Sequence, residues 1–289
     1  MWKGRAGDRS LQKYTVGMIL STASPLVTGG GPLFAALLAV AAYLVAALPR
    51  ATVGRWASPA LVLGWVMHLV LLVLDIGGWG QPDPGARLGF APVLSMTVWL
   101  VVAVHTIESR FLPLPEVRRW LALLGAAAVV VAVVFPGESR QYTSPLAPLH
   151  FALGVASYGL FGAAVLHATL LDAAERRLRL RAGPPGGAFG MPLLQLERLT
   201  FRFVEAGFVA LTATLVLGMV TAGGLRVDHK SVFSVLGWAV FAGLLAGRHW
   251  RGWRGGRATR WLYAGAALLL LAYAGSRFVF EVLLGRPPA

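Results

Sequence analysis

Histidine is the residue of this sequence best suited to chemistry, because the 289-residue chain contains six histidines and no cysteine. The lack of thiols excludes a disulfide framework, thiolate metal sites and iron–sulfur clusters. Imidazole is a good axial ligand for haem iron, and two imidazoles can hold the metal from opposite faces of the macrocycle. The histidines are therefore the candidate ligands for a metal or a haem.

Three histidines are predicted to lie in the outer half of a membrane. His150 begins the apolar run PLHFALGVASYGLFGAAVLHATLL, which is long enough to cross a hydrocarbon core of roughly 30 Å. His229 immediately precedes another apolar run, and His68 lies in a third, seven residues before Asp75 and roughly 10 Å below the same surface. An ionisable group at that depth is costly and is a functional candidate by default. We predict that His150 and His229 bind a cofactor metal as a pair, and that His68 is a deeper cofactor ligand.

The other three histidines are predicted to lie near the inner face. His105, beside Glu108, is expected to be a hydrated interfacial residue. His167 follows His150 by 17 residues, about 26 Å along the same helix, and is expected to be structural. His249, in HWRGWRGGR, is expected to anchor the membrane interface and to contact anionic lipid headgroups.

The outer loops also contain groups that suit a haem. The basic residues expected to pair with its propionates are Arg140, Arg226 and Lys230. The aromatic residues expected to lie against its flat apolar face are Trp79, Phe90, Phe135 and Phe233. The sequence does not show whether the helices carrying His150 and His229 touch.

The elements that position these residues are apolar helices. The chain is 57% hydrophobic and only 13% charged, with a mean hydropathy of +0.68, whereas a soluble domain carries about 25% charged residues. The eight apolar segments are 32–48, 57–75, 90–107, 120–136, 148–171, 201–222, 231–247 and 260–283. We predict an all-α polytopic membrane protein with about eight transmembrane helices, forming one domain over residues 32–289.

The distribution of positive charge predicts the orientation. The loops 49–56, 107–119, 172–202 and 248–260 contain 16 lysines and arginines, whereas the alternate loops 75–89, 137–147 and 223–230 contain 4. By the positive-inside rule the first set is cytoplasmic, so the C-terminus is predicted to lie outside. Residues 1–31 are interpreted as an N-terminal tail, and a cleaved signal or an over-extended start codon is the alternative.

Several function classes fit poorly. The formal charge of +14 is spread over loops between the spans, so nucleic-acid binding is not expected. A metal hydrolase is disfavoured because there is no H-E-x-x-H motif. Glu205 and Glu281, the acids within the predicted spans, both lie near span ends, which disfavours a deep proton relay. Because there is also no nucleophile–base pair and no phosphate-binding glycine loop, we predict that the chain is not an enzyme.

The run PLHFALGVASYGLFGAAVLHATLL resembles a helix of the cytochrome c assembly protein superfamily (the CcsA, CcmC and HemX relatives), which begins with an outer-face histidine and continues to a Ser-Tyr pair, here Ser157 and Tyr158. The segments 192–219, 229–261 and 272–284 resemble the YpjD-type, HemX-like branch of bacterial inner-membrane proteins. The resemblance covers about residues 32–286. It implies a multi-pass protein of the bacterial inner membrane, with His150 and His229 as an outer haem-binding pair and His68 as a membrane-embedded ligand.

One part of the family pattern is missing. Better-understood members carry a WGxxWxWD signature in the outer loop before the second outer histidine, whereas that loop is TAGGLRVD here. We therefore expect a haem-handling protein without the platform that delivers haem to apocytochrome. The alternative is a cofactor-free regulatory or accessory subunit, acting in tetrapyrrole synthesis or with a transporter through the arginine-rich loops 172–202 and 248–260. The expected partners are haem, the lipid bilayer and, in the alternative, another membrane protein.

Overall fold

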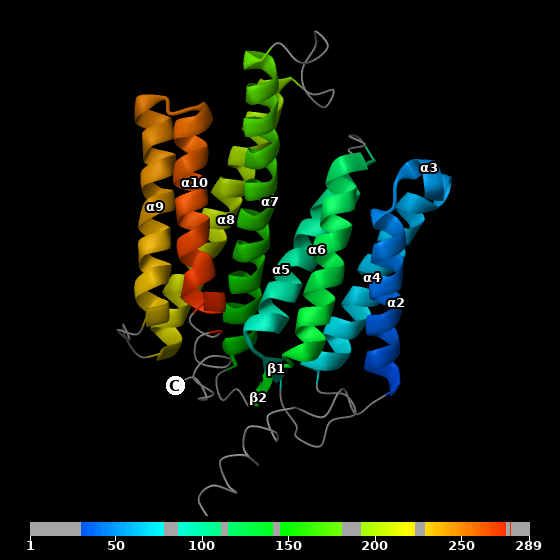
Figure 1. Ribbon diagram of the computed structural model, residues 1–289. Coiled ribbons are helices and arrows are strands. Elements are labelled where there is room, and N and C mark those ends of the chain that lie inside the picture. The colour runs from blue at the N-terminus through cyan, green and yellow to red at the C-terminus, as the bar shows by residue number, and fades with distance from the viewer. Residues whose placement is uncertain are drawn as a thin grey trace, which may run out of the picture.

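Helices form nearly all of the regular structure in the described part of the chain (Figure 1). The computed structural model describes residues 30–77, 86–110, 115–140, 145–180, 192–222, 229–275 and 278. In chain order, the elements are α2 (Gly30–Ala47), α3 (Arg50–Val53), η1 (Gly54–Trp56), α4 (Ala57–Ile76), β1 (Ala86–Leu88), α5 (Phe90–Glu108), α6 (Pro115–Val134), β2 (Glu138–Arg140), α7 (Ala147–Arg179), α8 (Leu193–Ala222), α9 (His229–Arg251), α10 (Gly255–Leu270) and the π-helix η3 (Leu271–Gly275).

Seven of the described helices are long and apolar enough to cross a bilayer, which confirms the prediction of an all-α polytopic membrane protein. The eighth predicted span falls on α10, which has 16 residues and passes directly into η3. Its predicted end at residue 283 lies outside the described residues, as do residues 1–29 of the predicted tail. The 33 residues of α7 extend about 50 Å at 1.5 Å each, so its arginine-rich end continues beyond the hydrocarbon core.

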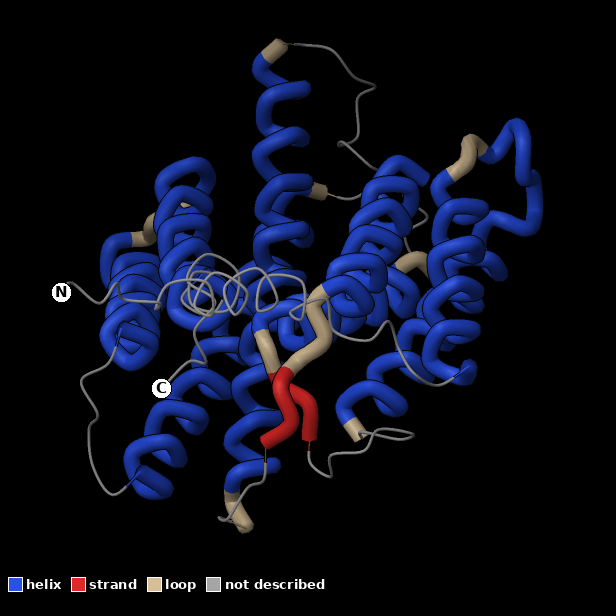
Figure 2. Tube along the Cα trace, turned by 60° about the horizontal axis from the view of Figure 1, so that its bottom comes forward, coloured by secondary structure: helices blue, strands red, loops and turns tan. Residues whose placement is uncertain are grey.

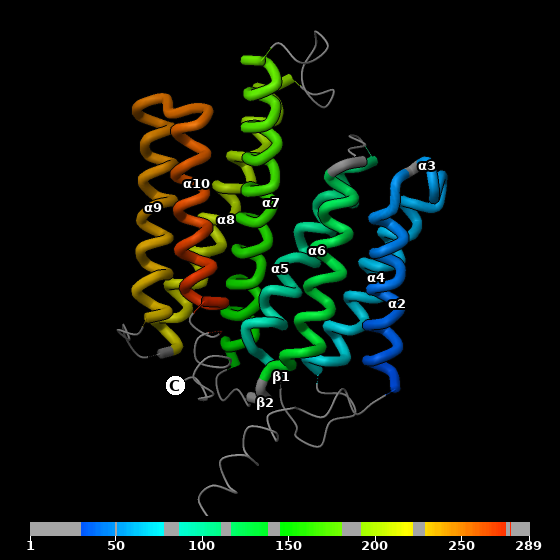
Figure 3. Tube along the Cα trace, in the orientation of Figure 1, coloured from blue at the N-terminus to red at the C-terminus, as the bar shows by residue number. Residues whose placement is uncertain are grey.

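The helices form two four-helix bundles, one after the other in the chain (Figure 3). The first contains α2, α4, α5 and α6, and its buried core surrounds Tyr43 and Val102. The second contains α7, α8, α9 and α10, and its core surrounds Phe161 and Phe241, whose rings stack at 3.9 Å between centroids. Each bundle therefore has a hydrophobic core of its own.

The pair α5 and α7 forms the main seam between the bundles. Two glycines of α7 permit the close approach. A Cβ at Gly159 would lie 2.5 Å from Cδ1 of Leu100, and a Cβ at Gly162 would lie 2.7 Å from Cγ2 of Val101. Because lipid does not drive helices together as water does, such small residues allow the van der Waals packing that associates helices in a membrane.

The connections segregate to the two ends of the molecule as the charge count predicts. In Figure 1, α3 and the inner ends of α7 and α9 lie at the upper end, where the arginine-rich connections are. The short strands and the starts of α7 and α9 lie at the lower end. We call these the inner and outer ends, following the predicted orientation.

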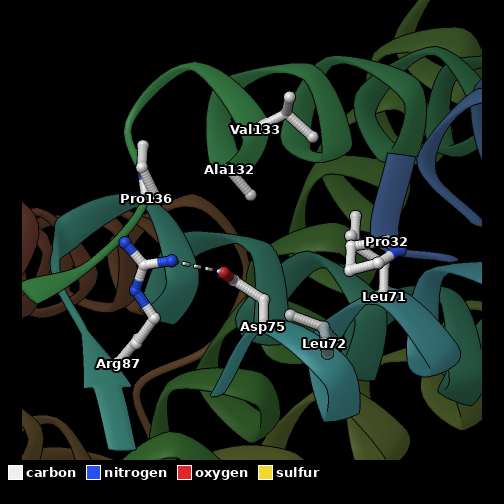
Figure 4. A pocket seen from close by; sticks show the side chains of 8 residues that line it. All are labelled: Pro32, Leu71, Leu72, Asp75, Arg87, Ala132, Val133 and Pro136. Carbon is white, nitrogen blue, oxygen red and sulfur yellow. Dashed lines mark ion pairs between the residues drawn. The ribbon is translucent and has the colours of Figure 1, made fainter. Parts of the chain in front are cut away.

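A two-stranded antiparallel sheet, which was not predicted, lies at the outer end (Figure 2). Ala86 of β1 pairs with Arg140 of β2, and the Nε of Arg87 donates to the carbonyl of Gly137 at 3.1 Å. The guanidinium of Arg87 also lies 3.8 Å from the carboxylate of Asp75 at the end of α4. Both residues line a small pocket whose other lining residues are apolar (Figure 4). These contacts join the outer ends of α4, α5 and α6.

Candidate functional site

His150 lies in the first turn of α7 and its ring packs against α8. A Cβ at Gly218 of α8 would lie 2.9 Å from Cε1 and 3.5 Å from Nδ1 of this ring. Any larger residue at that position would therefore press on the imidazole. Glycine therefore leaves room for the ring to pack against the backbone of α8.

The Nδ1 atom of His150 is buried and has no hydrogen-bond partner. Nearly all buried polar side-chain atoms in folded proteins have one, so an orphaned atom calls for an explanation. The backbone of Thr214 of α8 also lies near the ring. A neutral imidazole that donates from one nitrogen carries an unshared electron pair on the other. Nδ1 can therefore accept a hydrogen bond or bind a metal.

His229 is the first residue of α9 and is exposed at the same end of the same bundle. Helices α7 and α9 are connected through α8 and α10, which pack against both of them. The charge of Lys230, the next residue, lies within electrostatic reach of His150. The ammonium of Lys230 stands 5.2 Å from the ring centroid of Tyr273 in η3. The outer end of the second bundle thus gathers two imidazoles, an ammonium and a phenol.

His68 lies in the first bundle, away from these groups, and is fully buried. Its Nδ1 is hydrogen-bonded to the hydroxyl of Tyr43 at 3.2 Å, and its Nε2 to the hydroxyl of Ser95 at 2.7 Å. Both ring nitrogens therefore have protein partners, in contrast to His150. A metal at His68 would have to replace one of these two hydrogen bonds.

Of the histidines at the inner end, His105 differs from the prediction and His249 agrees with it. His105 is buried, with 3% of its surface exposed, and is not the hydrated interfacial residue that was predicted. It lies near Glu108, Arg118 and His167, which come from α5, α6 and α7. The neighbouring helices cover it, and this covering cannot be read from the local sequence. His249 is exposed in the last turn of α9, as expected of an interfacial residue.

The other predicted haem contacts are distributed as follows. Trp79 and Arg226 lie outside the described residues, and Arg140 takes part in β2. Phe90 packs against Phe135 and Phe278, with ring centroids 5.4 and 5.5 Å apart. Phe90 and Phe135 lie at the outer ends of α5 and α6, and Phe278 follows η3, so this aromatic cluster joins the two bundles at their outer end. Phe233 lies on α9, one turn after His229 and half-buried.

Sequence reasoning missed the Tyr273 and Gly218 contributions to the site. Tyr273 lies in a five-residue π-helix, a rare element that is frequent at functional sites. A glycine within the apolar segment 201–222 indicates that another helix can approach closely there. The sequence does not identify which helix does so. Both assignments depend on contacts between helices.

The chain matches the family described as Cytochrome C assembly protein over residues 53–284. It is 32% identical to the Inner membrane protein YpjD of Escherichia coli (strain K12), over 87% of this chain and 99% of that protein. It is 35% identical to an uncharacterized 28.8 kDa protein of Azospirillum brasilense, over 78% of this chain and 85% of the relative. It is also 25% identical to the Cytochrome c biogenesis protein CcsA of Prochlorococcus marinus (strain MIT 9303), over 85% and 91% of the two chains. No solved structure matches the chain.

Proposed function

The chain belongs to the cytochrome c assembly protein family, and from this premise we propose that it is an integral inner-membrane protein that binds or moves haem. The observation that carries this proposal is the buried, unpartnered Nδ1 of His150 beside the bare backbone of Gly218. A ring nitrogen without a hydrogen-bond partner can bind iron without first giving up a hydrogen bond.

Haem fits the available donors better than a bare metal ion does. No group of three or more histidine, aspartate and glutamate side chains in the described ranges is arranged to hold a metal. A porphyrin supplies four nitrogen ligands itself, so the protein needs to supply only one or two axial imidazoles. His150 and His229, both at the outer end of the second bundle, are the proposed pair.

His68 is proposed as a second, deeper station for the same cofactor. Its position in the first bundle separates it from the outer pair, so it would serve a haem before or after its stay at His150. Binding there requires Nε2 to exchange its hydrogen bond with Ser95 for iron, or Nδ1 its bond with Tyr43. This exchange makes His68 the weaker of the two stations.

The protein is proposed to act as a carrier or holder of haem, not as an enzyme. The outer loop before His229 has the sequence TAGGLRVD and contains no tryptophan. The resemblance assigns cradling and delivery of haem to a tryptophan-rich loop at this position, so we propose haem handling without that delivery platform. The predicted orientation places the His150 site and the C-terminal end of the chain on the outer side of the membrane.

The test is the absorption spectrum of the full chain, purified in mild detergent and incubated with haem. We expect a shifted Soret band that is strongly weakened by His150→Ala and by His229→Ala. His249→Ala is the matched control, because His249 is exposed near the other end of α9, the helix that begins with His229. A residual band that disappears only when His68→Ala is added would support the second station.

Two results would refute the proposal. One is the absence of any bound haem in a folded preparation, and the other is a spectrum that none of the three substitutions changes. Either result would leave the cofactor-free accessory subunit as the better hypothesis. Crosslinking from the arginine-rich segments at the inner end would then be the next experiment.

A further inference from the structure

Lys230 and Tyr273 form a cation–π contact at the outer end of the second bundle, near His150. Lys230 is the second residue of α9, and its ammonium lies 5.2 Å from the centroid of the Tyr273 ring. An ammonium over an aromatic face is held there by the ring quadrupole. The contact therefore gives a flexible lysine a preferred position at the outer end of the bundle.

The π-helix is what presents Tyr273. Element η3 continues α10 with wider turns over Leu271–Gly275, so the residues at this end of the helix face directions that a regular α-helix would not give them. The last α-helical turn is anchored to α7 because the hydroxyl of Tyr158 donates to the carbonyl of Leu269 at 2.5 Å. Tyr273 also lies within electrostatic reach of Tyr158. The phenol is therefore positioned by its contact with Lys230 of α9, next to a helix end that is anchored to α7.

The charge of Lys230 also reaches His150, so an ammonium lies near the imidazole whose Nδ1 has no hydrogen-bond partner. Three elements of the second bundle, α7, α9 and η3, contribute to this arrangement. A ligand that uses both groups must carry an electron-pair acceptor for the imidazole and an anionic group for the ammonium. A carboxylate suits the ammonium, since charge-assisted hydrogen bonds are about twice as strong as neutral ones.

We propose that Lys230, held over Tyr273, binds a carboxylate of the ligand whose metal is held by His150. This inference rests on the proposed function, and it identifies the haem propionates as the anionic part of the recognised ligand. Lys230 is then a specificity residue, because it favours macrocycles with ionised side chains over esterified ones. Tyr273 is a positioning residue that acts through Lys230.

The experiment compares haem with haem dimethyl ester, which has the same iron and macrocycle but no carboxylates. Both are titrated into the full chain in the same detergent, with the Soret band as the readout. The wild-type chain should bind haem about tenfold more tightly than the ester, the factor expected of one charge-assisted hydrogen bond. Lys230→Met should remove this preference by weakening haem binding alone, and Lys230→Arg should restore part of it.

Tyr273 is tested by two variants that separate the ring from the hydroxyl. Tyr273→Phe keeps an aromatic face under the ammonium and should retain the preference for haem. Tyr273→Leu removes that face and should reduce the preference severalfold. A drop of equal size in both variants would show that the hydroxyl, and not the ring face, is what matters, which contradicts the positioning role.

The outcomes distinguish this inference from the proposed function. If the wild-type chain binds neither ligand, the proposed function fails. If it binds both ligands equally well, with binding that depends on His150 but not on Lys230, the proposed function stands and the carboxylate site is refuted. Because Lys230 is exposed, Lys230→Met should leave the melting temperature unchanged, and a spectrum with the ester confirms that the variant is folded.

Discussion

His167 of α7 is hydrogen-bonded to Glu108 of α5, with 3.0 Å between Nε2 and Oε2, and so connects the two bundles at their inner end. Its Nδ1 lies 2.7 Å from the carbonyl oxygen of Ala163. The ring also stacks on Phe203 of α8 at 5.1 Å. The structural role predicted for His167 thus takes a specific form, a buried link across the seam.

Removing the carboxylate of this pair should destabilise the protein. Glu108→Ala leaves the buried Nε2 of His167 without an acceptor, which costs about 1–3 kcal/mol. Glu175→Ala is the control, because its partner Arg179 is 77% exposed and such pairs contribute about 0–1 kcal/mol. The free energy of unfolding of each variant can be measured by titration with a denaturing detergent. Equal losses in the two variants would mean that the seam does not depend on His167.

Haem binding should be sensitive to a single methyl group added at Gly218, where the ring of His150 packs on α8. In Gly218→Ala the new Cβ would lie 2.9 Å from Cε1 of His150, so the ring must move from its position. Overpacking of this kind costs about 1–3 kcal/mol, and a cost of that size in the haem complex would weaken haem binding about five- to 150-fold. Gly154→Ala is the matched control, because a Cβ there would meet only Cγ2 of Thr214 at 3.6 Å. The prediction is wrong if Gly218→Ala and Gly154→Ala bind haem with the same affinity.

The His68 network should depend on the glycines that enclose Tyr43. A Cβ at Gly64 would lie 2.8 Å from Cδ1 of Tyr43, and one at Gly125 would lie 2.8 Å from its Cζ. Gly64→Ala and Gly125→Ala should each destabilise the first bundle by about 1–3 kcal/mol, because this buried ring cannot shift without disturbing its hydrogen bond to His68. Gly31→Ala, which meets nothing within 4 Å, should be neutral or slightly stabilising. Thermal melts of the three variants test this, and an undisturbed Gly64→Ala would contradict it.

The orientation can be tested with single cysteines, because the chain contains none. Leu146, exposed just before α7, and Trp250, exposed in the last turn of α9, lie at opposite ends of the molecule. We expect a membrane-impermeant maleimide to label Leu146→Cys in intact cells and Trp250→Cys only after permeabilisation. The reverse pattern would place the His150 site on the cytoplasmic side.

The spans were predictable because a bilayer imposes a length and a composition on every helix that crosses it. The predicted segments 57–75 and 90–107 correspond closely to α4 and α5. The inner parts of α7 and α8 were less predictable. Hydropathy falls where the arginines begin, but the backbone hydrogen bonding of a helix continues into the aqueous layer. The segment predicted to end at residue 171 therefore extends to Arg179.

The roles of the individual histidines were harder to predict. His68 and His150 look alike in the sequence, each a polar residue in or beside an apolar run. In the folded chain His68 is bonded to Tyr43 and Ser95, 25 and 27 positions away, whereas His150 keeps one ring nitrogen without a partner. Helices that are apolar on nearly every face carry little periodicity to show which residues face a neighbour.

The sequence by itself determined that the chain is a bundle of membrane helices, which end of each helix carries positive charge, and which residues are able to bind a metal. These properties follow from the composition of each segment and from its free energy of transfer into lipid, and both can be evaluated one segment at a time. The tertiary structure decided that there are two bundles, that the ring of His150 packs on Gly218, and that Lys230 lies over the ring of Tyr273. These features depend on the close packing of particular side chains from distant segments, which only the folded chain brings together.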